Sequence, residues 1–244
     1  MEIKHSVVLV TGASSGIGET TARAVVKAGA RVVLLARRQD RLDDLASELG
    51  NNALALPCDV TSPAEVQKAI QIAQERYGRI DVLINNAGQG LYATIEDIDI
   101  EEFRELLNLN TVAPLMMMQA VIPLMRKQGA GCIVNVSSGA TLATYPGAAA
   151  YTSSKSALNM ISKVARLELA DAGITVSLIH PFMTETEFYG SVKAGLNTAQ
   201  AQAVGAASIA HPPSLVAQMI LDLIRTGDEE VDLVPKEYGG SFEG

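Results

Sequence analysis

The chain has 244 residues and is 48% apolar, and its 27 acidic and 19 basic residues give a net charge of −8. This composition predicts a folded protein with a sizeable core and excludes a largely disordered chain. The net acidity argues against nucleic acid or an anionic membrane surface as the main partner, although a local basic site would still hold an anionic cofactor.

Seven short apolar runs alternate with amphipathic stretches along the chain. The predicted strands are 7–10, 32–36, 53–56, 82–84, 133–136, 175–179 and 231–234. The predicted helices are 17–28, 40–49, 63–77, 101–127, 148–172 and 213–226. Because several of the strands are continuously apolar and β-branched, we expect them to be buried on both faces. The alternation predicts an α/β fold: a Rossmann-type, doubly wound parallel sheet of about seven strands with helices on both faces.

Local signals agree with these boundaries. Ser62 followed by Pro63 is typical of a capped helix start, and four glycines follow helical stretches, namely Gly29, Gly50, Gly78 and Gly173. No break in composition divides residues 1–244, which predicts a single domain. The segment 184–211 has a weak pattern, and it is interpreted either as a flap over a pocket or as a surface excursion.

No leader, membrane span or metal site is expected. The N-terminus lacks the regions of a signal peptide, and the longest apolar stretch, 112–125, is interrupted by prolines. Cys58 and Cys132 each lie beside an apolar run, without the spacing of a disulfide framework or a metal centre. These features predict two buried thiols in a reducing, cytoplasmic protein.

The unusual residues follow the predicted strands. The first six predicted strands are followed, in chain order, by Gly12 to Gly18, Arg37 and Arg38, Asp59, Asn85 to Gly88, Ser138, and Pro181. Ligands of open parallel sheets bind outside the carboxyl ends of the strands, near the point where the strand order reverses. We therefore expect these segments to form one site.

The first of these segments is a glycine-rich turn. Gly12 permits a tight exit from the strand, Gly16 lets the backbone approach a pyrophosphate, and Gly18 lets the next helix pack closely on the sheet. The helix N-terminus would present free N–H groups to the phosphates, with Ser14, Ser15 and Ile17 beside them. The alternative is an ordinary strand–helix turn.

Tyr151 and Lys155 lie four residues apart on a predicted helix and so share a face. Together with Asn85-Asn-Ala-Gly88 and the glycine spacing Gly-x3-Gly-x-Gly, this pair resembles the short-chain dehydrogenase/reductase family, in its shorter single-domain branch, over about residues 6–186. The resemblance implies an oxidoreductase that transfers a hydride to or from a nicotinamide cofactor. It also implies a catalytic tetrad of Asn110, Ser138, Tyr151 and Lys155. The alternative is that Tyr151 is merely a packed helix tyrosine.

The chemistry accounts for these residue types. A tyrosine with a pKa of about 10 is a poor base at neutral pH, but an ammonium about 4 Å away contributes roughly 4 kcal/mol at an effective dielectric of about 20. Lys155 would thereby lower the pKa of Tyr151 by up to about three units, opposed by desolvation. Ser138 would orient the substrate oxygen, and by resemblance Asn110 would hold a water in a proton relay.

The second strand ends at Ala36, where an enzyme that prefers NAD usually carries an acidic residue. Arg37 and Arg38 follow it and would hold a 2′-phosphate, which predicts NADP(H) rather than NAD as the cofactor. The alternative is that both are solvated loop charges. The resemblance adds further cofactor contacts at Asp59, Val60, Asn85, Ala87, Gly88, Tyr151, Lys155, Pro181 and Thr186. Phe182 departs from the family pattern, which has glycine after the proline.

The expected substrate walls are 89–95, 139–146 and 182–192, which contain no basic residue. They predict a neutral, largely apolar ketone or secondary alcohol as the substrate. One alternative is a 3-oxoacyl-thioester reductase, with Arg126 and Lys127 near the mouth. An alternative of another class is a non-enzymatic NADP(H)-binding sensor or scaffold. By resemblance we also expect a homodimer or homotetramer, with helices 101–127 and 148–172 as candidate interfaces.

Overall fold

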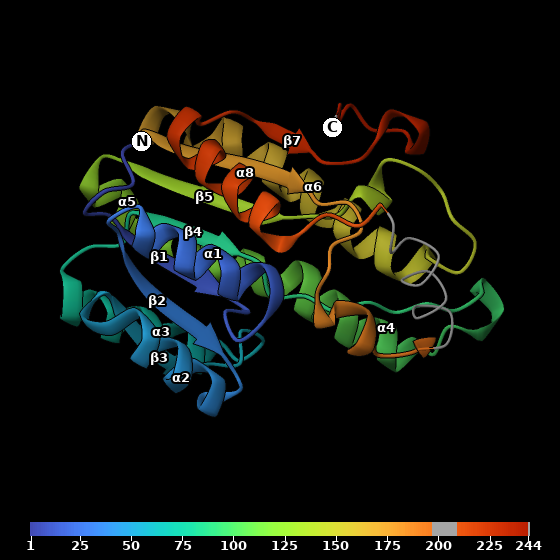
Figure 1. The fold of residues 1–244 in the computed structure, drawn as a ribbon, viewed down its shortest axis with the longest axis horizontal. Helices are drawn as coiled ribbons and strands as arrows, with labels where there is room; N and C mark the ends of the chain where they lie inside the picture. The colour runs from blue at the N-terminus through green and yellow to red at the C-terminus, as the bar shows by residue number, and fades with distance from the viewer. Residues whose placement is uncertain (197–208, 244) are drawn as a thin grey trace.

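The computed structural model describes residues 1–196 and 209–243. A sheet of seven parallel strands in the order β3-β2-β1-β4-β5-β6-β7 runs through the molecule (Figure 1). The strands are β1 (Val7–Thr11), β2 (Arg31–Ala36), β3 (Ala53–Pro57), β4 (Val82–Asn85), β5 (Gly131–Val136), β6 (Ile174–His180) and β7 (Glu230–Asp232). The predicted doubly wound α/β fold is confirmed, and each predicted strand overlaps an observed one.

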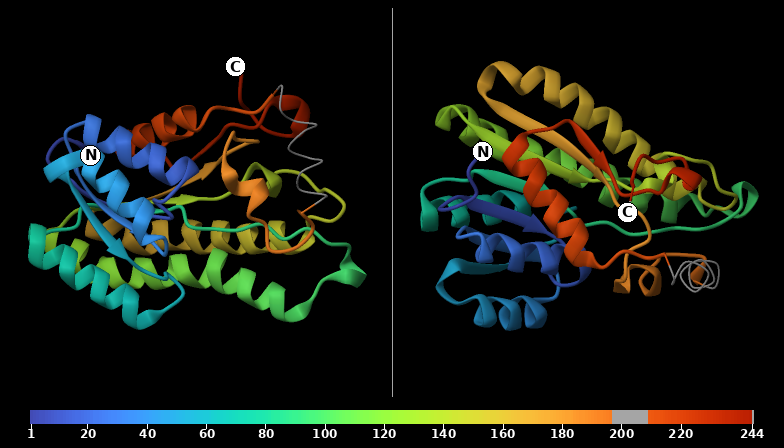
Figure 2. Two further views of the ribbon diagram at one scale, coloured as in Figure 1. Left: turned by 60° about the horizontal axis from the view of Figure 1, so that its bottom comes forward. Right: turned by 45° about the horizontal axis from the view of Figure 1, so that its top comes forward.

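Helices cover both faces of the sheet, as the left view of Figure 2 shows. One layer contains α1 (Gly16–Lys27), α2 (Gln39–Leu49) and α8 (Pro213–Thr226). The other contains α3 (Pro63–Tyr77), α5 (Ala113–Gln128) and α6 (Ala149–Leu169), while α4 (Ile100–Leu107) precedes α5. Each layer closes its own apolar cluster against the sheet, which accounts for strands that are apolar on both faces.

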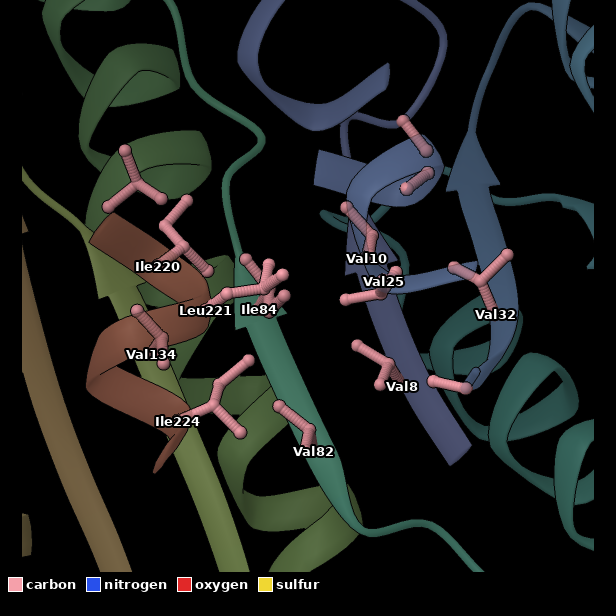
Figure 3. Packing of buried hydrophobic residues seen from close by; sticks show 14 of the residues in the cluster. Val8, Val10, Val25, Val32, Val82, Ile84, Val134, Ile220, Leu221 and Ile224 are labelled. Carbon is pink, nitrogen blue, oxygen red and sulfur yellow. The ribbon is translucent and has the colours of Figure 1, made fainter. Parts of the chain in front are cut away.

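Figure 3 shows the packing of the first cluster. Ile220, Leu221 and Ile224 of α8 point towards the β4 and β5 side chains Val82, Ile84 and Val134. On α1, Val25 packs near the valines of β1 and β2. These side chains are almost completely buried, and each buried aliphatic side chain contributes roughly 1.5–3 kcal/mol of transfer free energy. This packing fixes where α1 and its N-terminus meet the sheet.

The helix signals of the sequence are realised locally. The Ser62 hydroxyl accepts a hydrogen bond from the Glu65 backbone N–H at the start of α3, with Pro63 in the first turn. Gly78 ends that helix in the left-handed conformation, with a φ of 75°. Both sites therefore hold the residue type that their backbone geometry favours.

The predicted helix 101–127 is not continuous. A π-helical turn, Asn108–Val112, separates α4 from α5. Pro114 has no N–H to donate to the carbonyl of Asn110 four residues earlier, so the regular ladder is interrupted there. The whole stretch Ile100–Gln128 is long and apolar enough to pass as a membrane span by length and composition. Met117, Met118 and Met125 are nevertheless buried against the sheet, as is typical of a core helix.

The direction of winding reverses between β1 and β4. The chain goes from β1 outwards to β2 and β3, then crosses back to β4 on the other side of β1. All strands are parallel, so the segments that follow them meet at one edge of the sheet (Figure 1). This reversal point is where open α/β sheets place their ligands.

Candidate active site

A cavity of about 830 Å³ opens at the carboxyl ends of the strands. Sixteen of the expected site residues line it: Gly12, Ser14, Ser15, Gly16, Ile17, Arg37, Arg38, Asp59, Val60, Ala87, Gly88, Ser138, Tyr151, Lys155, Pro181 and Thr186. The other three, Gly18, Asn85 and Asn110, do not line it. One crevice therefore brings together the glycine turn and the Tyr151–Lys155 pair.

The glycine turn permits close contacts that a side chain would block. Gly12 has a φ of 66°, and a Cβ there would lie 2.9 Å from the Ala87 Cα. A Cβ on Gly18 would lie 2.4 Å from the Gly12 carbonyl oxygen. Gly16 has a φ of 56° and lies against Thr186, the residue expected to contact the carboxamide. The turn is thus tight, and it leaves its backbone open to the cavity.

The N-terminus of α1 faces the cavity and has no side-chain cap from the described residues. Within the described chain, no side chain caps it at Ser15, whereas Ser62 caps α3 and Asp99 caps α4. Ser15, Gly16 and Ile17 line the cavity. Unpaired N–H groups at a helix N-terminus favour phosphate, so these residues fit a dinucleotide pyrophosphate.

The fourth strand end is tied to the first by hydrogen bonds. The Thr11 hydroxyl accepts from the backbone N–H groups of Asn86, at 2.9 Å, and Ala87, at 3.0 Å. The Asn86 amide in turn donates to the Thr11 carbonyl at 2.9 Å. Asn85, expected at the cofactor, instead donates to Asn135 inside the core at 2.8 Å. The side chain that ties this strand end to β1 is therefore that of Asn86, which the sequence pattern does not distinguish from Asn85.

The buried Asn110 holds the loop beneath the cavity. Its Oδ1 accepts from the Gln89 N–H at 3.0 Å, and its Nδ2 donates to the Gln89 carbonyl and to the Ser154 hydroxyl. The Lys155 ammonium donates to the Val136 carbonyl at 2.9 Å. The π-helical turn therefore presents Asn110 to the site, and such turns are frequent at functional sites.

Burial governs the titration of the two proton-transfer residues. Desolvation raises the pKa of Tyr151 to about 12, and a hydrogen bond with Ser138 opposes this. Desolvation also lowers the pKa of Lys155 to about 8. The pKa of Tyr151 is therefore raised and not lowered towards neutrality, because desolvation outweighs the hydrogen bond with Ser138. At neutral pH Tyr151 is a phenol that holds its proton and Lys155 is mostly cationic.

Aromatic rings surround the Tyr151 end of the cavity. The ring of Tyr151 lies 6.1 Å from that of Tyr92 and 5.7 Å from that of Phe188, centroid to centroid. Phe182, the departure from the family pattern, lies 5.1 Å from Tyr238 of the C-terminal segment, and both line the cavity. Tyr238 carries no sequence signal, since only the fold brings it to the site.

The expected flap lies only partly within the described residues. Its described part, 184–196 and 209–211, borders the cavity through Phe188, Tyr189 and Ile209. Residues 197–208 lie outside the described residues. A parallel bridge pairs Thr184 with His211, and the two described ends are thereby joined.

The distribution of charge corrects two expectations about the substrate walls. Lys193, one residue beyond the predicted wall, lines the cavity and pairs with Glu105. Arg126 and Lys127 do not lie at the mouth. They occupy the last turn of α5, just before β5 begins, and thus at the opposite edge of the sheet from the cavity.

The two arginines after β2 differ in their contacts. Arg38 donates to the Ser14 hydroxyl at 3.0 Å and to the Ser15 hydroxyl at 2.7 Å, and so lies over the glycine turn. Arg37 lines the cavity, and its charge helps lower the pKa of Asp59, against burial and together with hydrogen bonds from Thr61. Both arginines therefore lie at the end of the cavity that adjoins β2, where they could hold the adenosine part of a dinucleotide.

Comparison with known proteins settles the family. A model of the short chain dehydrogenases matches residues 6–197. The chain belongs to the short-chain dehydrogenase/reductase family. It is an oxidoreductase of that family, whose fold binds nicotinamide cofactors.

Individual members of the family are similar in sequence and fold. The uncharacterized oxidoreductase YxjF of Bacillus subtilis is 38% identical over 76% of this chain and 73% of its own length. A 3-ketoacyl-(acyl-carrier-protein) reductase from Brucella melitensis, complexed with NADH, is 27% identical, with a TM-score of 0.86 over 95% of this chain and 97% of its own. An alcohol dehydrogenase from Thermococcus sibiricus, complexed with 5-hydroxy-NADP, is 26% identical, with a TM-score of 0.82 over 94% and 96%.

Proposed function

We propose that this dehydrogenase uses NADP(H) to interconvert a neutral, largely apolar ketone and its secondary alcohol. The observation that carries the proposal is the single cavity that joins the glycine turn, with its uncapped helix, to Ser138, Tyr151 and Lys155. A cofactor laid along it from the arginines would end beside the phenol.

The preference for NADP(H) is supported by charge. The last residue of β2 is Ala36 and not an acidic residue, and Arg37 and Arg38 follow it. The guanidinium of Arg38 is already fixed over the turn by Ser14 and Ser15. Guanidinium groups bind phosphate through paired N–H donors, and this geometry favours a 2′-phosphorylated ribose.

The side chains of the proposed tetrad have distinct tasks. The nicotinamide, when bound, supplies or accepts the hydride. Tyr151, protonated at neutral pH, donates its proton to the carbonyl oxygen during reduction, and Ser138 holds that oxygen. Lys155 binds the nicotinamide ribose, and Asn110, through its hold on Gln89, fixes the loop beneath.

The substrate class follows from the lining. Tyr92, Phe182, Phe188 and Tyr238 give the Tyr151 end an aromatic surface, and the charges of Glu105 and Lys193 are paired with each other. An uncharged carbonyl compound suits such a pocket. The similarity to the Brucella reductase favours a 3-oxoacyl thioester as the second candidate.

The test is cofactor oxidation with a panel of uncharged ketones and one 3-oxoacyl thioester, each with NADPH and with NADH. We expect turnover of the ketones, a higher kcat/KM with NADPH, and a loss of at least about 100-fold in kcat in Tyr151→Phe, since general acid catalysis contributes 100-fold or more. The matched control is Tyr92→Phe, which removes a neighbouring hydroxyl.

Three outcomes would contradict parts of this proposal. Absence of turnover with every carbonyl, despite tight binding of cofactor, would favour the sensor or scaffold. A higher kcat/KM with NADH would remove the cofactor preference, and near-normal turnover in Tyr151→Phe would remove its role as the acid.

A further inference from the structure

Glu187 reaches from the substrate side of the cavity to the arginines at its adenosine end. Its carboxylate accepts hydrogen bonds from Arg41 Nη1 at 3.0 Å to Oε1 and 2.8 Å to Oε2. The same Oε2 lies 3.3 Å from Arg38 Nη1. One carboxylate thus bridges two guanidinium groups, one after β2 and one in the first turn of α2.

This arrangement resembles the binding of an anion by two arginines. A hydrogen bond from Arg41, helped by Arg38 and opposed by desolvation, lowers the pKa of Glu187, so the group is ionised at neutral pH. Arg38 also holds Ser14 and Ser15, which line the same cavity. The bridging carboxylate therefore lies where the proposed cofactor would bring its 2′-phosphate.

We propose that Arg41 completes the 2′-phosphate subsite together with Arg38, and that Glu187 is an internal anion that competes with the 2′-phosphate for this subsite. The inference rests on the proposed binding of a dinucleotide along this cavity. A phosphate and a carboxylate repel each other, so both do not occupy one pair of guanidinium groups. NADP(H) displaces Glu187, whereas NAD(H) leaves the bridge intact.

The bridge also connects the two ends of the site. Glu187 begins the short 3₁₀ turn Glu187–Gly190, which carries Phe188 and Tyr189. Phe188 lies against the ring of Tyr151, and Tyr189 lies against Phe188 at 5.5 Å between centroids. Release of Glu187 by a 2′-phosphate therefore frees from α2 the turn that forms the aromatic wall beside the phenol.

The experiment measures dissociation constants for NADP⁺ and NAD⁺ by calorimetry in the full chain. Glu187→Gln should raise the ratio of NADP⁺ affinity to NAD⁺ affinity about three- to tenfold, the range expected when a pair of exposed ion pairs no longer competes. Glu185→Gln is the matched control. It removes the same charge two residues before Glu187, and the Glu185 side chain forms no ion pair among the described residues. An unchanged or lowered ratio in Glu187→Gln would overturn the competition.

Arg41 is tested where Glu187 no longer interferes. In the Glu187→Gln background, Arg41→Gln should lower the NADP⁺ to NAD⁺ affinity ratio at least about threefold, because a phosphate contact is lost. An unchanged ratio there would show that Arg41 serves only to hold Glu187. Each variant is compared with the chain from which it was made, so both tests remain decisive even if the wild type prefers NAD⁺. A wild-type preference for NAD⁺ would contradict only the proposed cofactor preference.

Discussion

Burial acts in opposite directions on the two proton-transfer residues. Tyr151 and Lys155 are both about 95% buried, and desolvation favours the neutral form of each. Desolvation raises the pKa of Tyr151 to about 12, so the phenol keeps its proton at neutral pH and can donate it during reduction. Desolvation lowers the pKa of Lys155 to about 8, so keeping the ammonium charged in the folded chain reduces the free energy of unfolding.

The cost at Lys155 predicts a specific pH dependence of stability. Between pH 8 and 10 the unfolded chain keeps the lysine proton and the folded chain loses it, so the free energy of unfolding should rise with pH by up to about 1.4 kcal/mol per unit from this group. Tyr151 acts with the opposite sign only above about pH 10, because its pKa is raised on folding.

The measurement is denaturant unfolding of the wild type and Lys155→Met at pH 7, 8, 9 and 10. The difference in the free energy of unfolding between wild type and Lys155→Met should be nearly constant up to about pH 8. It should then change in favour of the wild type by ~2 kcal/mol by pH 10. A constant difference over the whole range would show that Lys155 titrates normally in the folded protein.

At the scale of elements, the junction of β1 with α1 determines the phosphate site. The close approach of α1 depends on Gly18, which sits against the Gly12 carbonyl and the Asn86 amide. Packing of α1 on β1, β2 and α8 then directs its uncapped N-terminus into the cavity. A small change in this junction should therefore affect both stability and cofactor binding.

Gly18→Ala separates packing from helix propensity. Alanine in a helix is favoured over glycine by about 1 kcal/mol, but the new Cβ would lie 2.4 Å from a backbone oxygen. Because backbone does not move cheaply, we expect a net loss of about 1–3 kcal/mol in the free energy of unfolding and at least tenfold weaker cofactor binding.

Gly190→Ala is the control for this substitution, since a Cβ there meets open space. Thermal unfolding and cofactor titration would be compared in both variants. Stabilisation in Gly18→Ala would show that α1 shifts freely, and would contradict the tight junction.

At the scale of the whole molecule, one face of α6 is exposed and apolar. Met160, Val164 and Leu167 are 64%, 44% and 79% exposed, and their spacing places them along one side of the helix. Contiguous apolar surface of this kind marks an interface between proteins. We therefore predict that the chain forms a homodimer or homotetramer through this face.

Leu167→Glu should dissociate the assembly, because a charge would be buried without a partner. Light scattering coupled to size-exclusion chromatography would measure the mass. Ile95→Glu is the control, because Ile95 is 77% exposed and lies outside both candidate interface helices. A monomeric wild type would refute assembly, and an unchanged mass in Leu167→Glu would exclude this face.

Much of the fold was predictable because its signals are local. Apolar runs buried on both faces require a covered parallel sheet, and the capping residues set helix ends such as Ser62 and Gly78. The π turn at Asn108–Val112 was not predicted, although Pro114 explains it afterwards. Its form depends on packing as well as on the missing donor.

Most of the expected cavity residues were also predictable, because parallel strands bring their carboxyl ends to one edge. A strand end alone does not say which of two adjacent asparagines faces the core, and in the fold it is the Asn85 side chain that bonds to Asn135. The expected position of Arg126 and Lys127 was wrong because α5 runs antiparallel to the strands and its last turn lies at their amino ends.

The sequence by itself determined the doubly wound parallel sheet, the glycine turn and the meeting of the strand ends, because turn conformation and continuous apolar runs are encoded by neighbouring residues. Only the tertiary structure decided that Glu187 bridges Arg38 and Arg41, that Tyr238 reaches the cavity, and that burial raises the pKa of Tyr151. These depend on side chains far apart in the chain, and on the water that their packing excludes.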